Sequence, residues 1–278
     1  MQIQGSIAFI GGGNMASALG NGLLDGRLAP AQLHVLDVDA GIREAWHQRG
    51  VSVAEAPDER LAACSVWVYA VKPQVMREVV ANTQPWLRDA LVISIAAGLR
   101  LSSLASWLGG AGSEARPWGR LVRCMPNTPA LVGAGITGLV AREGLVDADR
   151  DLAAQLMQAV GEVVWVDDEP ALDAVTALSG SGPAYVFLFL QALIDGGVAL
   201  GLSPDQARRL ALGTLDGATR LAADSTESPA VLRQRVTSKG GTTAAALEVF
   251  ESHGWPQAVG EAMAAAARRA GTLADELG

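Results

Sequence analysis

The chain has 278 residues, of which half are hydrophobic and 18% are charged, and its net charge is −8. This composition supports a large folded core and excludes an intrinsically disordered chain. No Lys/Arg cluster stands out, so nucleic acid is not expected as a partner. No basic region precedes an apolar N-terminal segment, and the longest apolar run, 184–190, is too short for a membrane span. We therefore expect a cytoplasmic protein.

The two cysteines, Cys64 and Cys124, lie far apart in the sequence and form no C-x-x-C motif. This spacing favours neither a disulfide framework nor a zinc site, and no metal is expected.

The stretch that follows the N-terminus predicts a strand, a glycine turn and a helix. Residues 7–10 are apolar, three glycines follow, and an Ala- and Leu-rich pattern begins at Asn14. In the G-x-G-x-x-A motif, Gly11 makes the tight turn, Gly13 admits a pyrophosphate, and Ala16 lets the helix pack closely. The free N–H groups of the first helical turn then favour an anion. The alternative is an ordinary turn between a strand and a helix.

Strands and helices alternate along the first part of the chain. Further strands are predicted at 33–36, 51–53, 66–70, 91–95, 121–125, 135–140 and 162–166, and helices at 41–49, 74–87 and 147–160. This order is typical of a doubly wound parallel α/β sheet, a Rossmann-type dinucleotide-binding domain, which we place at residues 1–166. From Asp167 the pattern is helical only, so an all-α domain is predicted at residues 167–278.

An acidic residue follows the second predicted strand. Asp37 lies about twenty positions beyond the glycines, where a carboxylate binds the adenosine ribose. Asp37 and Asp39 would repel a 2′-phosphate, which favours NADH over NADPH. The alternative is that Asp37 only caps the next helix.

Two later loops follow strands of the same sheet. Val71, Lys72 and Pro73 are expected to pass under the diphosphate and ribose, unless the proline only starts the next helix. The small residues 96–98 would let a nicotinamide ring lie against the chain, and the alternative is a tight turn.

The predicted helix 183–200 is apolar on every face and should be buried all round. About 110 helical residues rarely enclose such a helix, so a homodimer is expected. The alternative is the central helix of a monomeric bundle.

A glycine pair flanked by hydroxyl residues precedes the predicted helix 244–251. The backbone N–H groups there, with the Ser238 hydroxyl, are expected to form a small cradle suited to a carboxylate. The Thr243 hydroxyl would then point at the group beside that carboxylate. The alternative is a glycine turn in which Thr242 or Thr243 is the N-cap.

Six motifs occur in one order along nearly the whole chain. They are FIGGGNMA at 9–16, AVKP at 70–73, SIAAG at 94–98, RCMPNTPA at 123–130, LSGSGPAYVF at 178–187 and TSKGGTT at 237–243. The sequence resembles the pyrroline-5-carboxylate reductases, which catalyse the last step of proline biosynthesis. The resemblance implies an N-terminal Rossmann domain and a helical dimerisation domain, with dimers often assembled into decamers.

The resemblance also implies roles for residues of these motifs. With Asp37, the cofactor NADPH or NADH would contact Ile10, Gly11, Gly12, Gly13, Asn14, Met15, Ala70, Val71, Lys72, Pro73, Ala96, Ala97, Gly98 and Asn127. The substrate would contact Ser238, Lys239, Gly240, Gly241, Thr242 and Thr243, and the catalytic Thr243 would donate a hydrogen bond to the ring nitrogen. Many relatives have proline at position 239, and the family's usual NADPH preference conflicts with Asp37 and Asp39.

The implied reaction moves hydride from the reduced nicotinamide to the imine carbon of 1-pyrroline-5-carboxylate and gives L-proline. We interpret His34, His47 and His253 as structural or exposed, not catalytic. A 3-hydroxyacid dehydrogenase of similar architecture would need a catalytic lysine, and only Lys239 follows Lys72. A sensor would bind the cofactor without turnover.

Overall fold

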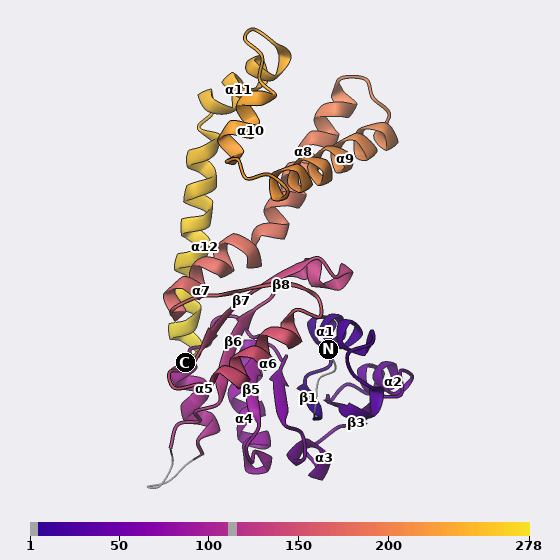
Figure 1. Cartoon of the computed structure of the whole chain (residues 1–278), viewed down its shortest axis with the longest axis vertical. Coiled ribbons are helices and arrows are strands. Elements are labelled where there is room, and N and C mark those ends of the chain that lie inside the picture. Colours follow the sequence, from indigo (N-terminus) through magenta and orange to yellow (C-terminus); the bar gives the residue numbers. More distant parts are fainter. Residues whose placement is uncertain (1–4, 111–115) are drawn as a thin grey trace. The chain divides into compact units, whose positions relative to one another are not determined.

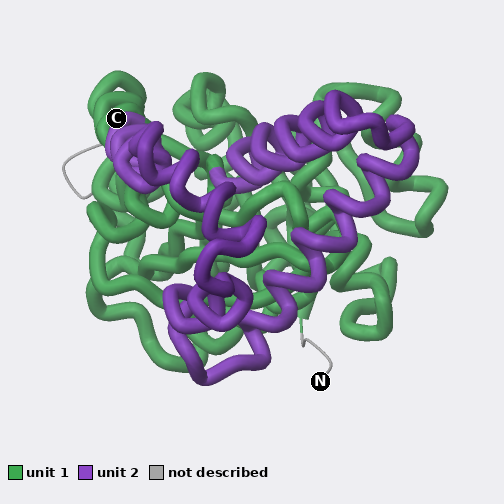
Figure 2. The backbone as a smooth tube through the Cα atoms, turned by 90° about the horizontal axis from the view of Figure 1, so that it is seen from above, with its two compact units in different colours: residues 1–181, 266–278 green, residues 182–265 purple. Residues whose placement is uncertain are grey.

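The computed structural model describes residues 5–110 and 116–278 of the chain. These residues form two compact units, which we call unit 1 and unit 2 (Figure 2). Unit 1 comprises the residues up to 181 together with 266–278, and unit 2 comprises residues 182–265.

Unit 1 is built on one sheet, in which the described residues supply eight strands in the order β3-β2-β1-β4-β5-β6-β7-β8 (Figure 1). The strands are β1 Ile7–Ile10, β2 Leu33–Leu36, β3 Ser52–Ala54, β4 Val66–Tyr69, β5 Leu91–Ser94, β6 Leu121–Met125, β7 Gly135–Ala141 and β8 Gly161–Trp165. The strand order reverses at β1, which pairs in parallel with both β2 and β4. This is the switch point at which doubly wound sheets bind ligands, so the predicted Rossmann-type fold is confirmed.

The helices of unit 1 connect these strands. They are α1 Asn14–Leu24, α2 Ala40–His47, α3 Glu59–Ala62, α4 Met76–Thr83, α5 Leu101–Leu108, α6 Asp147–Met157 and α7 Glu169–Val175, with short 3₁₀ turns at Pro30–Gln32, Pro73–Val75, Gln84–Trp86 and Thr128–Val132 and a π-helix at Thr176–Gly180. The helix predicted at 74–87 is divided, because Pro85 lacks the N–H that would continue α4. The sequence analysis missed α3 and α5, which are short.

Side chains alternate between the two faces of the sheet and form two apolar clusters. Phe9 packs with Leu19 of α1 on one face, and Ile10 and Tyr69 pack with Val80 of α4 on the other. Each large side chain buried in this way contributes about 1.5–3 kcal/mol to folding. The clusters hold the loops at the strand ends in fixed positions.

The expectation of a fully parallel sheet is wrong for β7 and β8. Strand β7 runs antiparallel to β6, with Cys124 opposite Leu139, and β8 is parallel to β7. The connection from β6 to β7 contains only a 3₁₀ turn, and antiparallel neighbours need no crossover helix.

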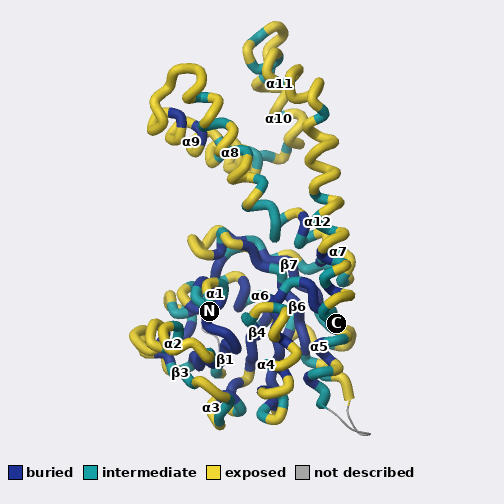
Figure 3. Tube along the Cα trace, turned by 180° about the vertical axis from the view of Figure 1, so that it is seen from behind, coloured by how far each residue is buried: buried dark blue, intermediate teal, exposed yellow. Residues whose placement is uncertain are grey.

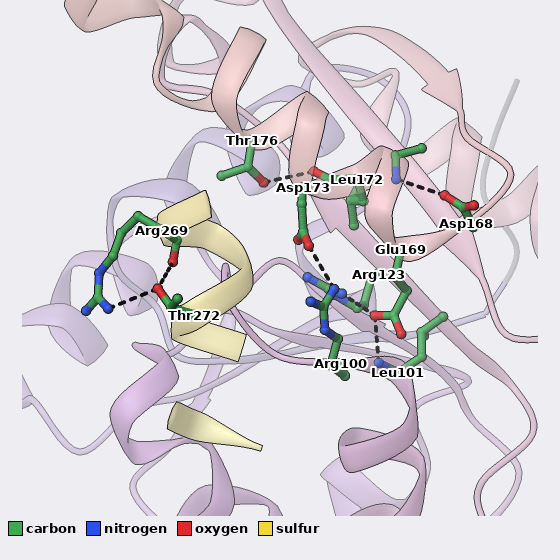
Figure 4. Close-up of polar contacts among 11 residues, drawn as sticks. Arg100, Leu101, Arg123, Asp168, Glu169, Leu172, Asp173, Thr176, Arg269 and Thr272 are labelled. Atoms are coloured by element: carbon green, nitrogen blue, oxygen red, sulfur yellow. Dashed lines mark hydrogen bonds and ion pairs between the residues drawn. The ribbon is translucent and has the colours of Figure 1, made fainter. Parts of the chain in front are cut away.

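Two ion pairs fasten α7 to the rest of unit 1 (Figure 4). Arg100 Nη1 lies 2.9 Å from Asp173 Oδ2, and the buried guanidinium of Arg123 pairs with Glu169. The same carboxylate accepts a hydrogen bond from Leu101 N, at the start of α5, over 2.9 Å. Glu169 therefore satisfies a buried charge and a free helix N–H together.

Unit 2 is helical throughout, as the sequence predicts for this part of the chain. It contains α8 Gly182–Ala199, α9 Pro204–Ala223, α10 Pro229–Arg235, α11 Thr242–Ser252 and the first turns of α12 Trp255–Leu277. Helices α8 and α9 lie against each other, and a Cβ on Gly197 would be only 3.1 Å from the Ala207 Cβ.

Helix α8 has no buried residue in the single chain (Figure 3). The side chains of Phe187 and Leu188 are 64% and 73% exposed. The alternative of a central helix in a monomeric bundle is therefore wrong, and an apolar helix this exposed needs a partner surface. Among the described residues, the helical stretch Glu169–Ala199 is the one that is long and apolar enough to cross a membrane, judged by length and composition alone.

Candidate active site

Gly11 brings two loops of unit 1 into contact. Its φ of +95° lies in the region that favours glycine, and a Cβ here would be 2.9 Å from the carbonyl group of Ala70. The turn after β1 therefore packs directly on the chain that leaves β4. No other residue type fits this position without moving one of the loops.

Gly12 is held through both of its backbone polar groups. Its N–H donates to Asp37 Oδ2 over 2.7 Å, and its carbonyl accepts from the Trp46 indole over 2.9 Å. A Cβ on Gly12 would lie within 3 Å of Val35, Ile42 and Trp46. Packing against these side chains and the two hydrogen bonds thus fix the glycine turn.

Gly13, unlike Gly12, has open space where a side chain would project. A Cβ on Gly13 would meet no atom within 4 Å. Gly13 is also the N-cap of α1, and no side chain caps the N–H groups of the first turn, which has no acidic residue. Free N–H groups at the positive end of an eleven-residue helix suit a diphosphate.

Asp37 does not cap the following helix. Asp39 is the N-cap of α2, where its Oδ1 accepts from Ile42 N over 2.9 Å. The two oxygens of Asp37 instead accept from Gly12 N and from Asp39 N. The capping alternative is therefore wrong, and Asp37 faces the glycine turn.

Asp37 also lines a pocket of about 300 Å³ beside the glycine turn. The pocket lies at the carboxyl ends of β1, β2 and β4, where Ile10, Gly11, Leu36 and Val71 contribute to its wall. Its size and position suit the adenosine part of a dinucleotide.

The loops 70–73 and 96–98 have a local structure that is compatible both with cofactor binding and with an ordinary turn. Pro73 does start a 3₁₀ turn, with Lys72 as its N-cap, directly after the strand β4. Gly98 is buried with a φ of +68°, and a Cβ there would be 3.1 Å from the Leu273 Cβ of α12. The loop after β5 therefore turns tightly at Gly98, and little room is left there for a side chain.

Asn127 connects parts of unit 1 through its side chain. Its Nδ2 donates to the Ser179 carbonyl over 3.2 Å, and its Oδ1 accepts from Ile136 N over 3.0 Å. The amide of this buried residue thus joins the π-helix Thr176–Gly180 to the first residues of β7.

The residues assigned to the substrate lie together in unit 2, between α10 and α11. Gly240 has a φ of +71°, and Gly241 N donates to the Ser238 carbonyl over 3.1 Å. Gly241 is the N-cap of α11, so the alternative that Thr242 or Thr243 caps this helix is wrong. Both threonines stand in its first turn.

The polar groups of this turn are available for a ligand. Ser238 Oγ lies so close to Gly241 that a Cβ there would be 2.4 Å away. Within the described residues, no hydrogen bond engages the hydroxyl of Ser238 or of Thr243, and no side chain caps α11. Free hydroxyls beside free N–H groups suit a carboxylate.

His34 and the two cysteines have structural roles. His34 is buried, its Nδ1 lies 3.0 Å from Ser52 Oγ, and burial lowers the pKa of the ring. Burial raises the pKa of the Cys64 thiol to about 11 and raises that of Cys124 further, so neither is a reactive thiolate. Across residues 5–110 and 116–278, no three His, Cys, Asp or Glu side chains group as metal ligands.

Several residues of the site gave no signal in the sequence analysis. The Trp46 indole reaches Gly12 across 34 positions of sequence, and Glu55 and Glu78 join Asp37 in the wall of the pocket. A tryptophan in a predicted amphipathic helix indicates burial, but its N–H partner depends on how that helix packs.

Two family models match the chain. An NADP oxidoreductase model, described as coenzyme F420-dependent, matches residues 6–98, and a pyrroline-5-carboxylate reductase dimerisation model matches residues 169–273. The chain is 45% identical over 274 residues to the pyrroline-5-carboxylate reductase of Pseudomonas aeruginosa, covering 98% of each protein.

Solved structures give the same result. The pyrroline-5-carboxylate reductase of Coxiella burnetii is 38% identical with a TM-score of 0.88, covering 98% of this chain and 99% of that one. The pyrroline carboxylate reductase of Plasmodium falciparum, solved with NADP bound, is 29% identical with a TM-score of 0.86, covering 99% and 100%.

Replacing Trp46 by Phe tests how the glycine turn is held. The substitution keeps most of the buried ring but leaves the Gly12 carbonyl with only the longer hydrogen bond from Ser17 Oγ, at 3.3 Å, a loss of about 1–2 kcal/mol. We expect a lower melting temperature and a severalfold higher Kd for NADH, measured by calorimetric titration. The control is Trp67→Phe, which removes an equally buried indole donor, to Leu61 O, away from the turn. Equal effects of both variants on the Kd would contradict a specific role for Trp46.

Proposed function

The chain belongs to the pyrroline-5-carboxylate reductase family, whose reaction reduces 1-pyrroline-5-carboxylate to L-proline. We propose which of its residues bind the cofactor and the substrate in this reaction. It is an NAD(P)H-dependent oxidoreductase that acts on a cyclic imine. The bound nicotinamide supplies hydride from C4 to the imine carbon. The protein's own work is to hold the two reactants, exclude water between them and stabilise charge.

Unit 1 holds the cofactor in this proposal. The first-turn N–H groups of α1, at Asn14 and Met15, bind the diphosphate, and Asp37 accepts from the adenosine ribose. The observation that supports this most strongly is the open face of Gly13 beside an uncapped helix end. The loops 70–73 and 96–98 line the ribose and the nicotinamide, and Asn127 supports the latter.

Unit 2 holds the substrate. The hydroxyl of Ser238 and the N–H groups of Gly240 and Thr242 bind the carboxylate of the ring, with the charge of Lys239 nearby. Gly241, whose N–H donates to the Ser238 carbonyl, fixes the shape of the turn. Thr243 donates its hydroxyl to the ring nitrogen. The support for this is the uncapped end of α11 and the two hydroxyls that have no partner in the described chain.

The chemistry asks little acid–base work of the protein. The hydrogen bond that Thr243 donates to the nitrogen of the neutral imine makes the imine carbon more electrophilic, and the nitrogen takes up a proton from solvent as the hydride adds. Alignment of the two reactants can supply about 7–11 kcal/mol. The absence of a reactive histidine or thiolate from the proposed roles fits such a reaction, because His34 and both cysteines serve the core.

The chain self-associates through its dimerisation domain. We propose that a second copy covers the apolar face of α8, that dimers assemble further into a decamer, and that the enzyme works in the cytoplasm without a membrane partner. The exposed Phe187 and Leu188 support the first of these, because a dimer buries apolar surface that one chain leaves open.

The direct test is oxidation of NADH or NADPH, followed by absorbance, when 1-pyrroline-5-carboxylate is added to purified protein. Turnover with either cofactor supports the proposal, and cofactor binding without turnover would contradict it.

Replacing Gly13 by Val tests the cofactor site. The side chain would fill the space that the diphosphate needs without touching the fold, since a Cβ there meets nothing within 4 Å. We expect at least a hundredfold higher Kd for NADH and a melting temperature lowered by only a few degrees, because valine is a poorer N-cap than glycine. The smaller Gly13→Ala serves as the graded control. Unchanged affinity in the valine variant would exclude this approach of the cofactor.

Replacing Thr243 by Ala tests the proposed hydrogen bond to the substrate nitrogen. Losing it should cost about 1–3 kcal/mol of transition-state stabilisation, roughly 5- to 150-fold in kcat/KM. The Kd for NAD(P)H should stay within twofold of wild type, and Thr243→Ser should restore most of the activity. Full activity in the alanine variant would remove the role assigned to this threonine.

A further inference from the structure

The pocket beside the glycine turn is acidic. Three carboxylates, those of Asp37, Glu55 and Glu78, contribute to its wall, and none of the described residues that line it is a Lys, Arg or His. A ribose 2′-phosphate carries a charge of about −1.5 to −2 near neutral pH. Such a group would enter a pocket of like charge with no cation in its lining.

A cation nevertheless stands at the edge of this pocket. Arg43, on α2, donates from Nη1 to the Asp37 carbonyl over 2.8 Å, so its guanidinium lies next to the end of β2. This is the place from which an arginine accommodates a 2′-phosphate in dinucleotide-binding folds. The arginine is therefore present but is not directed into the pocket.

Glu55 accounts for this. Arg43 Nη2 pairs with Glu55 Oε2 over 2.8 Å, so both terminal nitrogens of the guanidinium have partners. The Arg43 side chain is 20% exposed, whereas Glu55 is 69% exposed. The glutamate thus neutralises the arginine from the solvent side and adds its own negative charge to the pocket.

We propose that Glu55 is a cofactor-specificity residue, which pairs with Arg43 and, together with Asp37, makes the chain prefer NADH to NADPH. This inference rests on the cofactor site proposed above. It assigns Glu55 a role exerted chiefly through Arg43, with no contact to the reacting atoms. Removing the charge of Glu55 should free Arg43 for the 2′-phosphate.

The test is Glu55→Gln, which keeps the shape of a largely exposed side chain. Calorimetric titration with NADP⁺ and NAD⁺ gives the binding readout, and initial rates with NADPH and NADH give kcat and KM. We expect NADP⁺ to bind about three- to tenfold more tightly, on the scale of one exposed charge acting on a doubly charged phosphate. The ratio of the Kd for NAD⁺ to the Kd for NADP⁺ should rise, and the gain should shrink in high salt.

Two further variants separate this mechanism from general charge effects. Glu44→Gln removes one negative charge, as Glu55→Gln does, but from α2. Glu44 accepts a hydrogen bond from Gln48 and does not line the pocket. It should leave the ratio of the two dissociation constants unchanged. In the double variant Arg43→Gln/Glu55→Gln, the gain toward NADP⁺ should largely disappear.

The inference is overturned if Glu55→Gln does not tighten NADP⁺ binding, if Glu44→Gln tightens it equally, or if the gain survives loss of Arg43. Wild-type protein that binds NADP⁺ more tightly than NAD⁺ would overturn it as well. Each of these results still leaves a working dinucleotide site. Wild-type protein that binds neither dinucleotide would instead contradict the proposed function.

Discussion

The structure depends on the close approach of two pieces of backbone at Gly11. The turn after β1 lies within van der Waals distance of the chain leaving β4, and only a residue without a Cβ permits this. Because Gly12 is then held by Trp46 and Asp37, the free N–H groups of α1 have one fixed direction. We propose that a dinucleotide binds at this edge through backbone geometry and that the side chains around it decide which dinucleotide is preferred.

The sequence predicts those parts of the fold that are encoded locally. Apolar runs such as 7–10 and the glycines after them give strands and a turn within a residue or two of their observed positions. It could not give the direction of β7, because the pattern of residues 135–140 is the same in parallel and antiparallel strands. The sequence also does not predict the Trp46 hydrogen bond or the Arg43–Glu55 pair, because these depend on how different elements pack together. It does not predict the cap at Gly241, because this depends on the conformation of the loop before α11.

Helix α8 shows the same limit from the other direction. Its apolar residues correctly predict that water should be excluded from every face, but the single chain leaves it exposed. The dimerisation family model over residues 169–273 shows self-association, and we propose that a second copy covers this helix. Just before it, the pairs Arg123–Glu169 and Arg100–Asp173 fix α7 on unit 1, so the helical part of the chain starts from a rigid base.

The reaction transfers a hydride from C4 of the reduced nicotinamide to the imine carbon of the ring acid. The most direct measurement uses NADH deuterated at both C4 positions, with mass spectrometry and NMR of the proline formed in ordinary water. The account predicts proline that carries one deuterium on the former imine carbon. Cofactor oxidation that yields unlabelled proline, with the deuterium lost to solvent, would contradict it.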